Sequence, residues 1–213
     1  MWSSITTGII IVAYLAARIT LGGQCPAVEL QANFDIDQYL GKWYEIFRAE
    51  SVPFGSDGDC AVVRYSRKDD GGVDVDNRDY VIATDSFRSD GYGIDESFGE
   101  AYCSDWTSGL CHVRFFTLTP WGNYEVLDTD YTSYSIVYSC TTSMGGAFRP
   151  RFMWVLTRDA LVIGSPDHIA MKEKVNAIIN AKVPDWFDDN VMRPTTQTVA
   201  EGCKYNTDNV LVP

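Results

Sequence analysis

The chain has 213 residues, a formal net charge of −12, 46% hydrophobic residues and 13% aromatic residues. This length and composition are those of a globular protein of one domain or a tight pair of domains, and they exclude an intrinsically disordered or collagen-like chain. The negative charge repels nucleic-acid phosphates and anionic lipid headgroups, so we expect neither as a partner.

The first 23 residues differ from the rest of the chain. They contain no acidic residue and one basic residue, Arg18, and they carry an apolar run from Gly8 to Ala17. A bilayer span needs about 20 apolar residues, so this run is too short to cross a membrane. The pattern is typical of a secretory signal peptide. We expect a signal peptide over residues 1–23, a mature domain with a C-terminal tail over residues 24–213, and a secreted protein without stable membrane insertion. A retained N-terminal anchor is the alternative.

The cysteines support an extracellular location. All six follow the expected cleavage site, and an even number in an oxidising compartment predicts three disulfides. The sequence has no C-x-x-C pair and only two histidines, His112 and His168, so we expect no metal site. Cys103 and Cys111 have the spacing of a clip across one hairpin, whereas spacing leaves the other pairings open.

Between Lys42 and Arg158, short runs rich in Val, Ile, Tyr, Phe and Thr alternate with clusters of turn-forming residues. This pattern predicts successive antiparallel strands joined by tight turns. Eight such strands would leave two open edges, and closure into a barrel removes both. The predicted fold is therefore all-β, an eight-stranded antiparallel up-and-down barrel. The predicted strands are Trp43–Arg48, Ala61–Ser66, Val73–Tyr80, Ser97–Tyr102, His112–Thr117, Tyr124–Thr129, Ser133–Ser139 and Phe152–Thr157.

One C-terminal helix is predicted after the last strand. Ser165 is a suitable N-cap and Pro166 a suitable first helical residue. We expect the helix to pack outside the barrel through an apolar face formed by Ile169, Val175, Ala177, Ile178 and Ile179. The tail from Asp185 to Pro213 shows little periodicity, and Cys203 is its expected anchor.

Three short motifs occur in a fixed order along the predicted barrel. Gly41 and Trp43 form a G-x-W motif at the first strand, Thr129-Asp130-Tyr131 follows the sixth, and Arg158 follows the eighth. Together they resemble the lipocalin family over residues 25 to about 205, most strongly its branch with apolipoprotein D, insect bilin-binding protein and crustacyanin. The resemblance implies disulfides Cys25–Cys140 and Cys60–Cys203, which leaves Cys103 with Cys111.

Alternation along the strands predicts which end of the barrel is closed. Side chains alternate across a strand, so Glu45 and Phe47 would share the face of Trp43, while Trp154 would share that of Arg158. A guanidinium group over an indole ring contributes about 0.5 to 2 kcal/mol. We expect Trp43 and Arg158 to meet and close one end as structural residues, with the ligand toward the other end.

A small eight-stranded barrel either fills with side chains or holds one small ligand. The excess of aromatic residues favours a ligand. Alternation places six predicted pocket residues inside: Val113, Phe115, Tyr124, Val126, Phe152 and Trp154. The lipocalin resemblance adds Tyr65, Asn77 and Asp79 as polar groups that would meet the ligand near the mouth.

The sequence carries no catalytic signature. It has no G-x-S-x-G motif, and the glycine-rich run Gly91–Glu96 lacks the last glycine of a dinucleotide-binding loop. We therefore expect a carrier rather than an enzyme, with no covalent cofactor and a bilin, carotenoid, retinoid or lipid as its ligand. Two alternatives remain: an enzymatic lipocalin that uses a free inward-facing thiol, and a module that binds a protein at the open rim. The sequence gives no signal for an oligomeric state.

Overall fold

The computed structural model describes residues 23–53, 59–87, 97–105, 107–115 and 119–205. The predicted signal peptide, apart from Gly23, lies outside the described residues. So do the last two residues of the predicted strand His112–Thr117.

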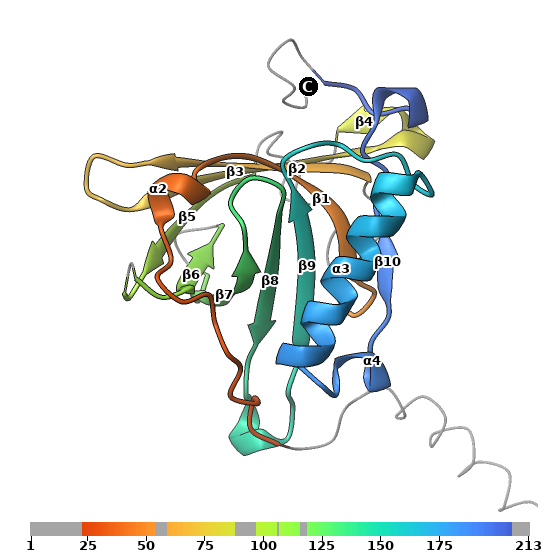
Figure 1. The fold of residues 1–213 in the computed structure, drawn as a ribbon. Coiled ribbons are helices and arrows are strands. Elements are labelled where there is room, and N and C mark those ends of the chain that lie inside the picture. Colours follow the sequence, from red (N-terminus) through yellow and green to blue (C-terminus); the bar gives the residue numbers. More distant parts are fainter. Residues whose placement is uncertain (1–22, 54–58, 88–96, 106, 116–118, 206–213) are drawn as a thin grey trace, which may run out of the picture.

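Eight antiparallel strands form a sheet that closes on itself (Figure 1). Each strand pairs with the next, and the last, β9, pairs with the first, β1. This closure confirms the predicted barrel. The eight strands are β1 (Gly41–Ala49), β2 (Asp59–Arg67), β3 (Val73–Val81), β5 (Ser97–Cys103), β6 (Leu110–Arg114), β7 (Gly122–Thr129), β8 (Tyr134–Cys140) and β9 (Arg151–Thr157).

Several short elements join the barrel that the sequence patterns do not predict. The strand β4 (Ser86–Phe87) pairs with β3, and β10 (Met192–Pro194) pairs with β1. None of the helices in the described ranges has the length and hydropathy of a membrane span. The short helical elements are α2 (Ile36–Tyr39), η1 (Ile82–Thr84), η2 (Met144–Gly146), α4 (Trp186–Asp189) and η3 (Val199–Glu201).

One end of the barrel, which we call the closed end, carries α2 and the start of β1. Here the Arg158 guanidinium lies 3.6 Å from the centroid of the Trp43 ring, which confirms the predicted contact. Arg158 also donates hydrogen bonds to the backbone carbonyls of Lys42 and Gln38, both at 2.8 Å. Gly41 has a φ of +94°, and a Cβ there would lie 3.4 Å from the Arg158 guanidinium. Glycine therefore suits both the backbone and the space.

The Thr129-Asp130-Tyr131 segment holds the turn between β7 and β8 at the same end. Asp130 accepts hydrogen bonds from the backbone N–H groups of Ser133 at 2.7 Å and Tyr134 at 3.1 Å. Burial alone would raise the pKa of Asp130, but a hydrogen bond from the Ser133 hydroxyl, the two backbone hydrogen bonds and Lys174 lower it to about 2. The Tyr131 hydroxyl accepts from the Asp35 backbone N–H at 3.0 Å, so the turn is tied to the segment before α2.

The predicted helix is present as α3 (Pro166–Lys182), which packs along the outside of the barrel (Figure 1). The Ser165 hydroxyl caps it by accepting from the His168 backbone N–H at 3.2 Å. The predicted apolar face is wrong at two positions, because Ile169 is 49% exposed and Ala177 is also exposed. His168, Val175 and Ile179 are buried instead.

The buried side chains form two main clusters on opposite faces of the sheet. The cluster that contains helix residues lies between the sheet and the helices α3 and α4. It includes Val175 and Ile179 of α3 and Trp186 of α4, packed on Ile136, Met153 and Val155 of β8 and β9. The other main cluster contains no α3 residue and is described with the candidate site below.

We predict that the stability of the folded protein depends on pH through His168 of α3. Its ring contacts Phe47 at 4.8 Å between centroids, and its Nδ1 accepts from the Gly164 N–H at 3.4 Å. Burial, followed by Lys172, lowers the pKa of His168, while Glu201 opposes the shift. As the pH falls, the imidazole of His168 is therefore protonated in the unfolded chain before it is protonated in the folded protein. The folded protein loses stability below about pH 6.5 as a result.

We expect urea unfolding to show a smaller loss of stability between pH 7.5 and pH 5 in His168→Gln than in the wild type. The matched control is His112→Gln, since His112 is the other histidine and lies on the outer face of β6, stacked on Tyr102. An unchanged pH dependence in His168→Gln would contradict the prediction.

Candidate ligand-binding site

The second main cluster of buried side chains fills the inside of the barrel. It draws residues from all eight long strands and none from α3, which lies outside the sheet. Most of its members are aliphatic or aromatic, so the interior is apolar. The strand residues of this cluster are Trp43, Val63, Tyr65, Val73, Val75, Cys103, Cys111, Val126, Val137 and Leu156.

The structure brings six of the nine predicted pocket residues together in this interior cluster. Tyr65 and Val126 are buried members, and Val113, Phe115, Tyr124 and Trp154 pack against it with partial exposure. Phe152 contacts the Trp154 ring at 6.1 Å between centroids, but it packs against the cluster beneath α3. The six residues of the interior cluster therefore line the inside of the barrel together. That they contact a ligand stays a prediction.

The three polar residues expected near the mouth do not lie together. Tyr65 pairs with Gly41 at the closed end, so the expectation that it lies at the mouth is wrong. Asn77 and Asp79 continue the alternation of the buried residues Val73 and Val75 along β3, away from the closed end. Asn77 is exposed and Asp79 is half-buried. Only these two are placed to meet polar groups near the open end.

A chain of buried hydroxyl groups crosses the interior near the closed end. The Tyr124 hydroxyl bonds to those of Tyr65 at 2.7 Å and Tyr39 at 2.8 Å, and Tyr39 also bonds to the Ser135 hydroxyl at 2.9 Å. Burial raises the pKa of Tyr39 to about 12 and those of Tyr65 and Tyr124 well above their usual value. These phenols stay neutral, so the chain joins α2, β2, β7 and β8 without introducing charge.

A cavity of about 20 Å³ lies beside this hydroxyl chain. Its lining includes Phe34, Val73, Ala101, Val113 and the Cys103–Cys111 disulfide, and none of its lining residues is charged. A space of this size holds about one water molecule. A ligand of the expected classes would therefore have to lie between this cavity and the open end.

Sequence reasoning missed an ion pair on the inner face of β1. The pairing of β1 with β9 shifts between Glu45 and Phe47, which places Phe47 outside against His168 and sets Arg48 opposite Trp154. The prediction that Phe47 faces inward is therefore wrong. Glu45 and Arg48 form an ion pair at 2.5 Å, and both are buried. Because residues opposite each other in a ladder share a face, the pair borders Leu156 and Trp154. No signal in the sequence marks such a shift.

All six cysteines are paired, as Cys25–Cys140, Cys60–Cys203 and Cys103–Cys111. This confirms the pairing that the family resemblance implies. An enzymatic lipocalin with a free inward-facing thiol is therefore excluded. Within the described residues, no group of three or more His, Cys, Asp or Glu side chains is placed to hold a metal ion.

Comparison with known proteins identifies the family. Residues 34–176 match the family model described as a lipocalin-like domain. The chain belongs to the lipocalin family. The family is known for binding small hydrophobic ligands. This lipocalin is 39% identical to apolipoprotein D of Bos taurus over 139 residues. The matched stretch covers 64% of this chain and 67% of the relative. This lipocalin is also 30% identical to the Lazarillo protein of Schistocerca americana over 155 residues. That match covers 67% of this chain and 68% of the relative.

Solved structures show the same barrel. Lobster apocrustacyanin A1 superposes with a TM-score of 0.62 at 16% identity and covers 84% of this lipocalin and 91% of its own chain. Insecticyanin from the tobacco hornworm Manduca sexta superposes with a TM-score of 0.61 at 21% identity and covers 87% and 92%. At these identities the likeness establishes the fold alone.

Proposed function

We propose that this lipocalin is a secreted, non-enzymatic carrier that holds one small hydrophobic ligand in the open-end half of its barrel. The observation that carries the proposal is the apolar interior cluster, built from all eight strands and closed at one end by Trp43 and Arg158. A concave apolar site with a few polar groups is the usual form of a small-molecule site.

The ligand we propose is elongated or planar, and a bilin or carotenoid fits the aromatic wall best among the classes that the family resemblance implies. Trp154 and Phe115 offer aromatic surface inside the barrel, and such rings gain most from a ligand with a large π surface. Asn77 and Asp79 supply polar groups toward the open end. The net charge of −12 disfavours a ligand with several carboxylates unless these stay in water at the rim.

Secretion is supported by the cysteines and by the N-terminal sequence. Three disulfides join segments as far apart as Cys60 and Cys203, and disulfides persist mainly in oxidising compartments. The apolar run from Gly8 to Ala17 supports the same conclusion. Detection of the mature chain, without residues 1–23, in the culture medium of an expressing eukaryotic cell would test this part of the proposal.

Ligand binding is expected to quench tryptophan fluorescence with one site per chain. We would titrate the protein separately with biliverdin, astaxanthin, retinol and a fatty acid, and record the absorption spectrum of protein purified from its source. A visible band would indicate a pigment. Trp154→Ala should weaken the affinity about tenfold or more, as loss of a buried aromatic contact does. Trp121→Ala is the control, because Trp121 lies outside, beneath Arg114.

The titrations have a clear negative outcome. If none of the four compounds gave a saturable quench, the carrier function in this form would be wrong, and binding of a protein at the open rim would become the better hypothesis. If Trp154→Ala bound as tightly as Trp121→Ala, the ligand would lie elsewhere in the barrel.

A further inference from the structure

The C-terminal tail forms part of the barrel wall. We call residues 192–205 the strap; it consists of β10, η3 and the segments around them. The strands β1 and β2 pair directly only from Gly41↔Tyr65 to Tyr44↔Val62. Beyond this point β1 pairs with β10 instead, from Phe47↔Pro194 to Ala49↔Met192. The strap thus occupies the position where β1 and β2 would otherwise meet toward the open end.

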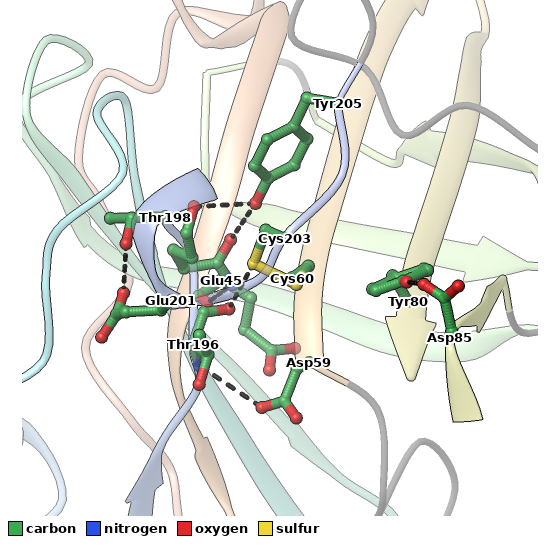
Figure 2. Close-up of a disulfide and its surroundings, with 11 residues drawn as sticks. Glu45, Asp59, Cys60, Tyr80, Asp85, Thr196, Thr198, Glu201, Cys203 and Tyr205 are labelled. Atoms are coloured by element: carbon green, nitrogen blue, oxygen red, sulfur yellow. Dashed lines mark hydrogen bonds between the residues drawn. A yellow bond between two sulfur atoms is a disulfide. The ribbon is translucent and has the colours of Figure 1, made fainter. Parts of the chain in front are cut away.

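Hydrogen bonds join the strap to both neighbouring strands. On the β1 side, the Thr195 N–H donates to the Ile46 carbonyl at 2.9 Å, and the Gln197 side-chain amide donates to the Glu45 carbonyl. On the β2 side, the Cys60 N–H donates to the Thr196 carbonyl at 2.7 Å. Figure 2 shows Thr196 and Cys203 beside Cys60, with Glu45 nearby. The strap therefore separates two strands that continue as direct neighbours nearer the closed end.

Alternate side chains of the strap are buried in the barrel wall. Thr195 is 1% exposed and Gln197 is fully buried. The Tyr205 hydroxyl donates to the Gln197 carbonyl at 2.8 Å and lies 3.2 Å from its side-chain oxygen. The Cys60–Cys203 disulfide joins the far end of the strap to β2. The disulfide thus fastens the strap to β2, while Tyr205 holds Gln197, whose side-chain amide donates to the Glu45 carbonyl of β1.

The strap also reaches the inner face of the wall. The Thr195 hydroxyl donates to the Glu45 carboxylate at 2.9 Å, and Glu45 pairs with Arg48, the residue opposite Trp154. Paired strands lie about 4.8 Å apart, so without the strap β1 and β2 would be separated by about 10 Å at this height. An opening of that width, separated from Trp154 by β1, would admit a flat or elongated apolar molecule from the side.

We infer that the strap is a lateral gate of the ligand compartment, fastened by the Cys60–Cys203 disulfide and by Tyr205. The inference rests on the proposed carrier function. When the strap is docked, the wall between β1 and β2 is complete and the ligand is retained. When it detaches, the seam next to Glu45 and Arg48 opens, and the ligand leaves without passing the open end. Local detachment of one element is a common low-energy opening in proteins.

The gate is tested by removing the Cys60–Cys203 disulfide and comparing ligand dissociation with that of a variant that lacks a different disulfide. Cys60→Ser/Cys203→Ser releases the strap, and Cys25→Ser/Cys140→Ser removes a disulfide of similar sequence separation, 115 against 143 residues, that does not touch the seam. We expect retinol, followed by its fluorescence after mixing with lipid vesicles, to dissociate about tenfold faster from the first variant and about as fast as wild type from the second.

A milder variant covers the case in which the double variant does not fold. Tyr205→Phe removes one hydroxyl that bonds Gln197, and we expect dissociation to become about fivefold faster, the effect of one lost hydrogen bond. The control Tyr102→Phe alters a tyrosine on the outer face of β5. Equal dissociation rates in Tyr205→Phe and Tyr102→Phe would overturn the gate.

Hydrogen exchange separates failure of the gate from failure of the carrier function. If wild-type protein bound none of the probe compounds, the carrier function would be wrong and the gate with it. If it bound retinol, the backbone amides at positions 195 and 60 should exchange faster in both strap variants while amides between β7 and β8 stay protected. Faster exchange without faster dissociation would mean that the strap opens but the ligand leaves by the mouth, which would overturn the inference.

Discussion

Replacing Trp43 by alanine is expected to lower the free energy of unfolding by about 3 to 5 kcal/mol, the usual cost of removing a fully buried tryptophan. The indole lies under the Arg158 guanidinium, packs against the Tyr39 ring at 5.2 Å between centroids, and donates to the Tyr39 carbonyl at 2.8 Å. Its loss leaves a cavity and an unstacked cation, and it removes one of the two hydrogen bonds that the Tyr39 carbonyl accepts. Urea unfolding followed by circular dichroism measures the effect.

Two controls identify the cause. Trp121→Ala removes a tryptophan from the outer face, where it is 36% exposed, and should cost much less. Arg158→Ala should cost less than Trp43→Ala, since the remaining indole still fills the closed end. Neither closed-end variant should change the intrinsic affinity for a ligand. A loss below about 1 kcal/mol for Trp43→Ala would show that the closed end does not depend on this residue.

The parts of the fold that sequence reasoning predicted are those that depend on local patterns. Each predicted strand overlaps a strand of the barrel, because alternation and turn-forming residues act over a few neighbours. The strand β10 was not predicted because three residues carry no periodicity and its pairing partner, β1, lies about 150 residues earlier in the chain. The error at Ile169 has a related cause: His168 takes the buried position through its contact with Phe47, and helical spacing cannot reveal that contact.

The candidate site divides in the same way. Val113 and Trp154 were found by alternation within regularly paired stretches of strand, which needs no knowledge of the tertiary structure. The hydroxyl chain could not be found, because Tyr39 and Ser135 meet only when α2 is folded against β8. The Glu45–Arg48 pair was missed because the irregular pairing near Phe47 reverses the alternation, and irregularities of this kind depend on the partner strand. Alternation therefore predicts a wall reliably only up to the first irregularity of its strand.

Loss of the Cys25–Cys140 disulfide is expected to have the other large effect on stability. Its sequence separation is 115 residues, for which chain entropy gives a ceiling of about 5 kcal/mol, whereas the Cys103–Cys111 disulfide, with a separation of 8, gives only about 2 to 3 kcal/mol. The measured loss for Cys25→Ser/Cys140→Ser should be smaller than the ceiling. Other contacts still hold the N-terminal segment, including the hydrogen bond from the Gln31 N–H to the Val126 carbonyl at 2.9 Å.

Urea unfolding of Cys25→Ser/Cys140→Ser and Cys103→Ser/Cys111→Ser tests this order. If restriction of the unfolded chain dominates, the first variant loses more stability, although Cys103 and Cys111 are both buried in the interior cluster, whereas in the first pair only Cys140 is buried and Cys25 borders the cluster beneath α3. If native packing dominates, the order reverses, because both serines of the second variant would be buried, whereas only the serine at position 140 would be buried in the first. A larger loss for the Cys103–Cys111 variant would therefore contradict the prediction and assign the role of that disulfide to packing near the hydroxyl chain.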